Sequence, residues 1–347
     1  MVEMIENTWR GRGMLQDVPL PVADAGRVAM LLKDCPAHAE TPLRDLPTLA
    51  AEAGVAALWV KDESGRMGLG SFKALGAAFA LAVDAAAADP GDMGMALAGR
   101  TYVTASAGNH GMSVAAGARV FGARAVVYIA ETVPEAFADR LRAKGAEVVR
   151  QGAVYEDSMA AAEAAAAARG WTLLSDSSWP GYTAPAMRVM EGYLQLAAEA
   201  VAQVPSTPTH ILLQAGVGGM AAAVAAYARA AWGDAVHIIV VEPAFAPALY
   251  ESIRAGALVD TVGPESAMGR LDCKTPSLVG LAGLGRDADA FATLTEDEVA
   301  KGVAWLAAHG LATTPSGGAG LAALHAGLDL PRDARVLTIL SEGPEDG

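Results

Sequence analysis

The stretch RMGLGSFKALGAAFA, residues 66–80, places a single lysine, Lys73, after two glycines and Phe72 and at the start of a run of small and apolar residues. Alanine-rich sequence has a high helix propensity, so the stretch predicts a helix over 71–88 with Lys73 in its first turn. A lysine at that place can be an ordinary solvated charge. If a helix N-terminus and an apolar pocket surround it instead, its pKa falls and its free amine can attack an aldehyde.

On either side of this stretch, short β-branched runs alternate with alanine-rich helical runs. The alternation is typical of a mostly parallel sheet covered by helices, and it predicts an α/β fold. The expected strands cover 57–62, 101–106, 124–130, 146–152, 210–216, 236–243 and 335–343. Besides 71–88, the expected helices cover 111–121, 133–144, 155–169, 184–204 and 219–232.

Three of the strand–helix units fall within residues 97–175. We therefore expect a small α/β domain there, inserted into a larger domain made of residues 1–96 and 176–347. Ligands of open α/β sheets bind at the carboxyl ends of the strands, near a switch in strand order or a domain junction. The polar loops that follow the expected strands are therefore the candidate site.

The balance of charges argues against some classes of partner. The 347-residue chain has 25 Lys and Arg against 39 Asp and Glu, a formal net charge of −14. Nucleic acids and anionic membranes require a basic face, so we expect neither as a partner. The sequence has no run of about 18 apolar residues, and residues 1–12 lack the basic-then-apolar order of a signal peptide. We expect a cytoplasmic protein that binds a small molecule.

The chain has two cysteines, Cys35 and Cys273, which belong to no CxxC or His-rich spacing. Neither a metal site nor a disulfide framework is indicated by this pattern. Both residues are expected to be buried structural thiols.

A glycine cluster, QAGVGGMAAAV at 214–224, follows one expected strand and opens the next expected helix. Glycines let the backbone approach a ligand closely, and free N–H groups at a helix N-terminus suit a phosphate. The spacing matches neither GxxxxGKS nor GxGxxG, so neither a nucleoside triphosphate nor a dinucleotide is favoured. By itself the cluster fits a phosphate cradle and an ordinary tight turn equally well.

Two more loops carry polar groups. In TASAGNHGMS (104–113), small residues leave the backbone amides of Ser106 to Asn109 accessible, which suits a carboxylate, and the Asn109 amide can bond a hydroxyl. The neighbouring His110, taken alone, is more typical of a structural histidine at a helix start. Ser341 follows the last expected strand, and its hydroxyl can meet a neutral ring nitrogen.

An amine, a phosphate cradle, a hydroxyl partner and a ring-nitrogen partner together suit pyridoxal phosphate, whose ring withdraws electrons from a carbanion. The chain also resembles the tryptophan-synthase-β-like, fold-type II pyridoxal-phosphate enzymes. The motifs that carry the resemblance occur in the family's order over most of the chain: GSFKALGA (70–77), SAGNHG (106–111), GVGGM (216–220) and LSEG (340–343). The resemblance implies the two-domain fold of that family, with open, mostly parallel sheets flanked by helices.

Within this family the chain is most similar to the diaminopropionate ammonia-lyases. The similarity is carried by residues 59–77, SDSSWPGY (175–182), MEGY (190–193) and SAMGRLDCKTPS (266–277). It implies α,β-elimination on a small amino acid like 2,3-diaminopropionate, giving a 2-oxo acid and ammonia, in a homodimer. The alternatives are a threonine or serine dehydratase, a β-replacing enzyme like cysteine synthase, and a catalytically silent cofactor-binding protein.

The resemblance also implies a role for each matching residue. Lys73 holds the cofactor as a Schiff base, and either Lys73 or Asp176 takes the α-proton of the substrate. Cofactor contacts are expected from Phe72 at the ring, Asn109 at the 3′-hydroxyl, Ser341 at the ring nitrogen, and Gly216, Val217, Gly218, Gly219 and Met220 at the phosphate. The substrate is expected at Ser106, Ala107, Gly108, Asn109 and His110.

One position departs from the pattern of this branch. The branch carries Asp-Gly-Asn-His where this chain has Ala107 before Gly-Asn-His, so one of two expected acidic groups is missing and activity on both enantiomers is in question. Asp176 matches the other acidic group, although SDSS is also an ordinary Asx or helix-capping turn. Arg270 and Lys274 are either candidates for holding a second anionic group of the substrate or solvated loop charges.

Overall fold

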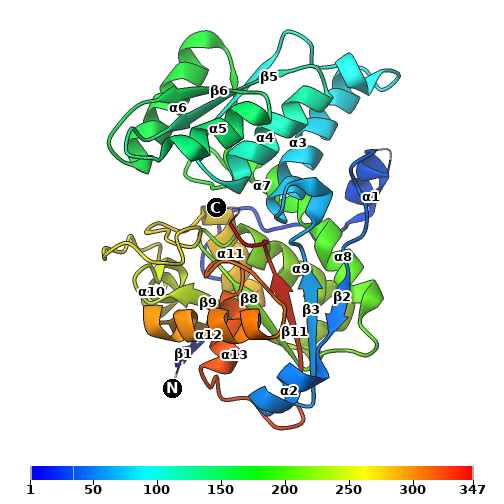
Figure 1. Ribbon diagram of the computed structural model, residues 1–347, viewed down its shortest axis with the longest axis vertical. Helices are drawn as coiled ribbons and strands as arrows, with labels where there is room; N and C mark the ends of the chain where they lie inside the picture. The colour runs from blue at the N-terminus through cyan, green and yellow to red at the C-terminus, as the bar shows by residue number, and fades with distance from the viewer. Residues whose placement is uncertain (1, 34, 346–347) are drawn as a thin grey trace.

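The computed structural model describes residues 2–33 and 35–345 and contains two open sheets flanked by helices (Figure 1). The larger sheet has the strand order β1-β10-β9-β8-β11-β3-β2. Its strands are β1 (Glu3–Glu6), β10 (Ala290–Leu294), β9 (His237–Pro243), β8 (His210–Gln214), β11 (Arg335–Leu340), β3 (Ala57–Asp62) and β2 (Leu43–Asp45). The inner strands pair in parallel, and the edge strands β1 and β2 pair antiparallel.

The smaller sheet is parallel throughout, with the order β6-β5-β4-β7, and lies in the upper part of Figure 1. Its strands are β4 (Thr101–Ala105), β5 (Arg124–Ile129), β6 (Ala146–Arg150) and β7 (Thr172–Leu173), and its helices are α4 (Asn109–Val120), α5 (Glu135–Ala143) and α6 (Tyr155–Arg169). Helix α3 (Lys73–Ala88) packs against both α4 and α7 (Ala184–Gly192). The domain limits at 97 and 175 stay a prediction.

The faces of the larger sheet are buried by different sets of helices. Along β8, Ile211 and Leu213 pack into the cluster that includes α8, α9 and α11, whereas Leu212 packs into the cluster that includes α2, α12 and α13. The bounds are α1 (Gly26–Leu32), α2 (Pro47–Ala53), α8 (Leu194–Gln203), α9 (Gly219–Trp232), α10 (Ala248–Ala255), α11 (Leu278–Asp287), α12 (Glu296–Ala308) and α13 (Ala319–His325). No helix in the described part of the chain is long and apolar enough to cross a membrane.

These elements confirm the predicted α/β fold, with three kinds of difference: where strands end, where helices begin and where one predicted helix is divided. The strands expected to reach 216 and 343 end at Gln214 and Leu340, because the backbone after them leaves the sheet as polar loops. The helices expected from 71 and 111 begin at Lys73 and Asn109.

The third difference is that residues 184–204 form two helices, α7 and α8, with Tyr193 between them. At Gly192 a Cβ atom would lie 2.6 Å from the carbonyl oxygen of Leu75, so a glycine is needed where α7 packs on α3. The interruption leaves the Tyr193 ring beside the start of α3, where it contacts Phe72.

A buried ionic network fixes the loop that leads to Lys73. Arg66 is fully buried; its Nε donates to Glu63 at 2.7 Å and its Nη2 donates to Glu199 at 2.7 Å. Lys61 Nζ also contacts Glu199 at 2.7 Å, and Arg66 Nη1 donates to the carbonyl of Ala39 at 2.8 Å. The Arg66 guanidinium therefore connects the loop after β3 to helix α8, and Lys61 connects β3 itself to the same helix.

We expect Arg66→Met to lower the free energy of unfolding by about 3–5 kcal/mol, because it leaves the buried Glu63 carboxylate without its cation and Glu199 with only Lys61. Urea unfolding followed by circular dichroism measures this loss. The matched control is Arg124→Met, since the Arg124–Glu147 pair is exposed and a surface pair is worth about 0–1 kcal/mol. Equal losses in the two variants would contradict a stabilising role for the network.

Candidate active site

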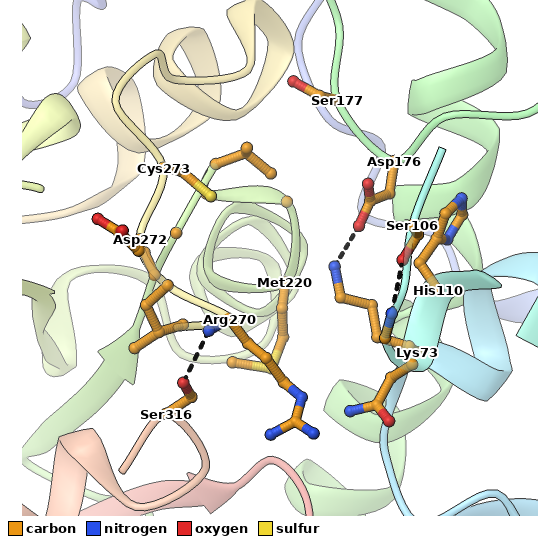
Figure 2. A pocket seen from close by; sticks show the side chains of 18 of the residues that line it. Lys73, Ser106, His110, Asp176, Ser177, Met220, Arg270, Asp272, Cys273 and Ser316 are labelled. Carbon is orange, nitrogen blue, oxygen red and sulfur yellow. Dashed lines mark hydrogen bonds and ion pairs between the residues drawn. The ribbon is translucent and has the colours of Figure 1, made fainter. Parts of the chain in front are cut away.

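A cavity of about 530 Å³ opens at the carboxyl ends of strands from both sheets. Its walls include every residue that the sequence predicts for the site: Phe72, Lys73, Ser106, Ala107, Gly108, Asn109, His110, Asp176, Gly216, Val217, Gly218, Gly219, Met220 and Ser341. Figure 2 shows Lys73 and Asp176 pointing toward each other on one side, with Arg270, Asp272 and Cys273 on the opposite side. The structure therefore brings loops from five parts of the sequence to one cavity.

The central contact is the ion pair between Lys73 Nζ and Asp176 Oδ2. Although burial opposes ionisation of both groups, the Asp176 carboxylate raises the pKa of Lys73 above its usual range, and the Lys73 ammonium holds the pKa of Asp176 well below its usual range. The expectation that a helix N-terminus and an apolar pocket lower the pKa of Lys73 is therefore wrong. The adjacent Asp176 carboxylate outweighs the desolvation that opposes the charged form of Lys73.

Two aromatic rings pack against each other beside Lys73, and Phe72 is the one that lines the cavity. Phe72 and Tyr193 meet edge to face with their centroids 4.9 Å apart, and Lys73 Nζ lies 5.4 Å from the centroid of the Phe72 ring. The Tyr193 hydroxyl is buried and has no hydrogen-bond partner among the described residues, and burial raises the pKa of Tyr193 above its usual range. Sequence reasoning identified Phe72 as a site residue and used Tyr193 only as part of the MEGY motif. The position of the Tyr193 ring depends on the break between α7 and α8.

The glycine cluster lies between β8 and the N-terminus of α9. Gly218 has a φ of +95°, which favours glycine, and it directly precedes α9. A Cβ atom at Gly216 would lie 2.9 Å from Cys273 Sγ and 3.0 Å from Leu271 Cα. The backbone is therefore packed closely on one side and open to the cavity on the other, as a phosphate cradle requires.

In the loop from Ser106 to His110, more backbone amides donate hydrogen bonds within the protein than the sequence predicts. The Ser106 amide donates to the carbonyl of Tyr128 at 3.2 Å, and the Gly108 amide donates to Ser106 Oγ at 3.3 Å. The expectation that all the amides from Ser106 to Asn109 are accessible is therefore wrong for Ser106, whose N–H continues the pairing of β4 with β5, and for Gly108, whose N–H donates to the Ser106 hydroxyl. His110 is buried, with its Nε2 2.9 Å from the carbonyl of Leu174.

A carboxylate that sequence reasoning passed over, Glu342, lies next to Ser341 at the end of β11. Its Oε1 accepts from Arg270 Nη1 at 2.8 Å and from the Thr314 hydroxyl, and its Oε2 accepts from Asn109 Nδ2. Burial raises the pKa of Glu342 despite these donors. The signal available in the sequence was its position in LSEG, directly after the predicted Ser341.

The basic residues of the 266–277 segment are paired with acidic side chains. Arg270 also contacts Glu345 at 2.9 Å, and Lys274 contacts Asp272 at 2.5 Å. Neither is therefore a solvated loop charge. Cys273 lines the same cavity as Arg270 and Lys274. Burial raises the pKa of its thiol to about 12.

The chain is similar to known pyridoxal-phosphate dependent enzymes. A family model described as pyridoxal-phosphate dependent enzyme matches residues 35–342. Diaminopropionate ammonia-lyase from Escherichia coli K12 is 34% identical over 337 residues, covering 88% of this chain and 85% of the relative. The enzyme of the same name from Salmonella typhimurium is 33% identical over 296 residues, covering 78% of this chain and 72% of the relative.

Solved structures of a diaminopropionate ammonia lyase are also similar to this chain. The Escherichia coli diaminopropionate ammonia lyase in complex with an aminoacrylate-PLP azomethine reaction intermediate superposes with a TM-score of 0.89 at 32% identity. The superposition covers 99% of this chain and 94% of that chain. A complex of the same enzyme with D-serine superposes with a TM-score of 0.89 at 31% identity and the same coverage.

Proposed function

Because the chain belongs to the pyridoxal-phosphate dependent enzymes, we propose that it is an ammonia-lyase that converts 2,3-diaminopropionate to a 2-oxo acid and ammonia. The observation that carries the proposal is the Lys73–Asp176 pair, which faces a cavity that also contains a glycine-rich helix N-terminus. An amine, a carboxylate and an anion cradle are the groups that this elimination requires from the protein.

The residues present fit pyridoxal phosphate. Bound in the cavity, the cofactor supplies an aldehyde carbon for an amine and a ring that withdraws electrons from the substrate Cα. Lys73 Nζ provides the covalent anchor, and the backbone of Gly216 to Met220 at the start of α9 binds the phosphate. Phe72 packs at the ring, Asn109 bonds the 3′-hydroxyl, and the Ser341 hydroxyl meets the ring nitrogen.

Asp176 and Lys73 handle the protons. Asp176 Oδ2 holds the Lys73 ammonium when Nζ is free, and this contact can return a proton to Nζ or accept one from it. When Nζ takes the proton from the substrate Cα, Asp176 stabilises the resulting ammonium. The partly buried position of both side chains limits competition from water for the same proton.

Phosphate binding by the glycine loop gives a testable expectation for Gly216→Ala. The new methyl group would meet Cys273 Sγ at 2.9 Å and the backbone of residue 271 at 3.0 Å, so the loop must shift. We expect the dissociation constant of pyridoxal phosphate to rise at least about tenfold, or about 1.4 kcal/mol. Equilibrium dialysis of the apoprotein measures the change.

The control for this variant is Gly91→Ala, where a Cβ atom would make only an ordinary contact, 3.4 Å from Asp89. It should bind the cofactor as the parent protein does. If Gly216→Ala also retains the parent affinity, the phosphate does not bind at this loop.

The substrate carboxylate binds at the loop of Ser106 to His110, where Ala107 contributes only a methyl group to the cavity wall. A methyl group cannot move a proton, so acid–base chemistry depends on Lys73 and Asp176. We expect one enantiomer of 2,3-diaminopropionate to be turned over at least about 10²-fold faster than the other, since a positioned base contributes about 10²–10⁴-fold. Equal initial rates of ammonia release from the D and L forms would contradict this.

A substrate panel tests the reaction class. The holoenzyme is incubated with 2,3-diaminopropionate, serine and threonine, and both ammonia and 2-oxo acid are measured. Release from 2,3-diaminopropionate above the others supports the proposal, and preferential release from serine or threonine indicates a dehydratase. Product that forms only after a thiol is added would overturn the lyase assignment in favour of β-replacement. A spectrum that responds to amino acids without turnover would indicate a silent binding protein.

We expect a homodimer, which sedimentation equilibrium measures directly, and a cytoplasmic location. We also expect residues 97–175 to behave as one small domain, which limited proteolysis at its two borders tests.

A further inference from the structure

The Glu342 carboxylate lies where three distant segments meet. It is buried in the cavity wall directly after Ser341. It accepts hydrogen bonds from Asn109 at the start of α4, from Arg270 in the 266–277 segment and from Thr314 before α13. The proposed reaction makes no direct use of this charged group.

The contact with Asn109 determines how the carboxamide is oriented. A carboxamide has an acceptor on one side and a donor on the other, and its neighbours decide which side faces which partner. An ionised carboxylate only accepts, so Glu342 requires Asn109 to present Nδ2. That nitrogen carries two hydrogens, and the second is left for an acceptor in the cavity.

The remaining contacts hold the Glu342 carboxylate in place. Arg270 Nη1 at 2.8 Å balances its buried charge, and the Thr314 hydroxyl donates to the same oxygen. A Cβ atom at Gly317 would lie 2.7 Å from Glu342 Cγ, so the glycine makes room for this side chain. These contacts therefore fix the position of the Glu342 carboxylate that accepts the hydrogen bond from Asn109.

We propose that Glu342 is a positioning residue, which fixes the Asn109 carboxamide so that an N–H of Nδ2 faces the 3′-hydroxyl of bound pyridoxal phosphate. This inference rests on the proposed function, in which Asn109 bonds that hydroxyl. A hydrogen bond donated to the oxygen stabilises its ionised form over its protonated form. Glu342 thus tunes the ionisation of the cofactor without touching it.

The test is the absorption spectrum of cofactor-loaded Glu342→Gln before substrate is added. A glutamine has nearly the same shape but only one accepting oxygen. It therefore cannot accept from Asn109 with one atom and from Arg270 and Thr314 with the other. We expect the ratio of ionised to protonated 3′-hydroxyl, read from their separate absorption bands, to fall about tenfold, as for loss of a hydrogen bond to a charged group. This readout does not depend on turnover.

The matched control is Glu345→Gln, which also loses an ion pair with Arg270, at 2.9 Å, but leaves Glu342 and Asn109 in place. It should keep the parent spectrum. Asn109→Ala should shift the spectrum as Glu342→Gln does, and adding Glu342→Gln to Asn109→Ala should change nothing further. A further change of similar size in the double variant would overturn the inference, because Glu342 would then act independently of Asn109.

If Glu342→Gln does not fold, the spectrum of Thr314→Val is measured instead, because this variant removes one donor to Glu342 with little change in shape. A shift in the same direction supports the inference, and a parent-like spectrum overturns it. The parent protein separates this inference from the proposed function. If the parent forms no borohydride-stable adduct at Lys73, the proposed function fails. If it forms the adduct and Glu342→Gln has the parent spectrum, only the role of Glu342 fails.

Discussion

Lys73→Ala should lower ammonia release from 2,3-diaminopropionate by more than about 10⁴-fold. A positioned proton-transfer group contributes about 10²–10⁴-fold, and the covalent anchor of the cofactor is lost with it. The variant also leaves Asp176 without its cation in a partly buried site. Initial rates at saturating substrate and cofactor measure the loss.

The control for this variant is Lys301→Ala, which removes an exposed lysine on α12. It should retain the activity of the parent protein. If Lys73→Ala retained more than a hundredth of the parent rate with normal folding, Lys73 would not be the anchor and the proposed chemistry would be wrong.

Asp176→Asn should lower turnover by about 10²–10⁴-fold while the protein still binds pyridoxal phosphate. Asparagine preserves the shape but can neither accept a proton nor balance the Lys73 ammonium. Burial would then lower the pKa of Lys73 with no carboxylate to oppose it. Activity and cofactor absorbance measured on the same sample separate loss of catalysis from loss of binding.

For comparison, Asp297→Asn changes an exposed carboxylate at the start of α12 and should have no effect on either readout. A parent-like rate for Asp176→Asn would mean that Asp176 only caps the turn at 175–178. The two interpretations of the SDSS segment, as a base or as a turn, are thereby distinguished.

Much of the fold and the positions of the site loops could be predicted because the informative residues are local, whereas the role of each site residue came from the resemblance to the pyridoxal-phosphate enzymes. Helices such as 155–169 and 219–232 follow directly from alanine-rich runs between glycines or loops. The site loops are marked by small residues that follow buried strands, and those residues line one cavity as expected. Strands β1, β2, β7 and β10 were missed, because two to five residues without strong β-branched enrichment give little signal.

Properties that depend on long-range contacts could not be predicted. The direction of the Lys73 pKa is set by Asp176, which lies 103 residues further along the chain. Glu342 receives its contacts from residues 28, 72 and 233 positions away. A charged residue in a loop gives no sign of such partners until the fold brings them together.

The central claim is that Lys73 Nζ forms the covalent link to the cofactor, and reduction followed by peptide mapping tests it most directly. Purified protein is loaded with pyridoxal phosphate, treated with borohydride, digested and analysed by mass spectrometry. We predict one reduced phosphopyridoxyl adduct, on the peptide that contains Lys73. Its absence from that peptide, or its presence on another lysine alone, would contradict the account.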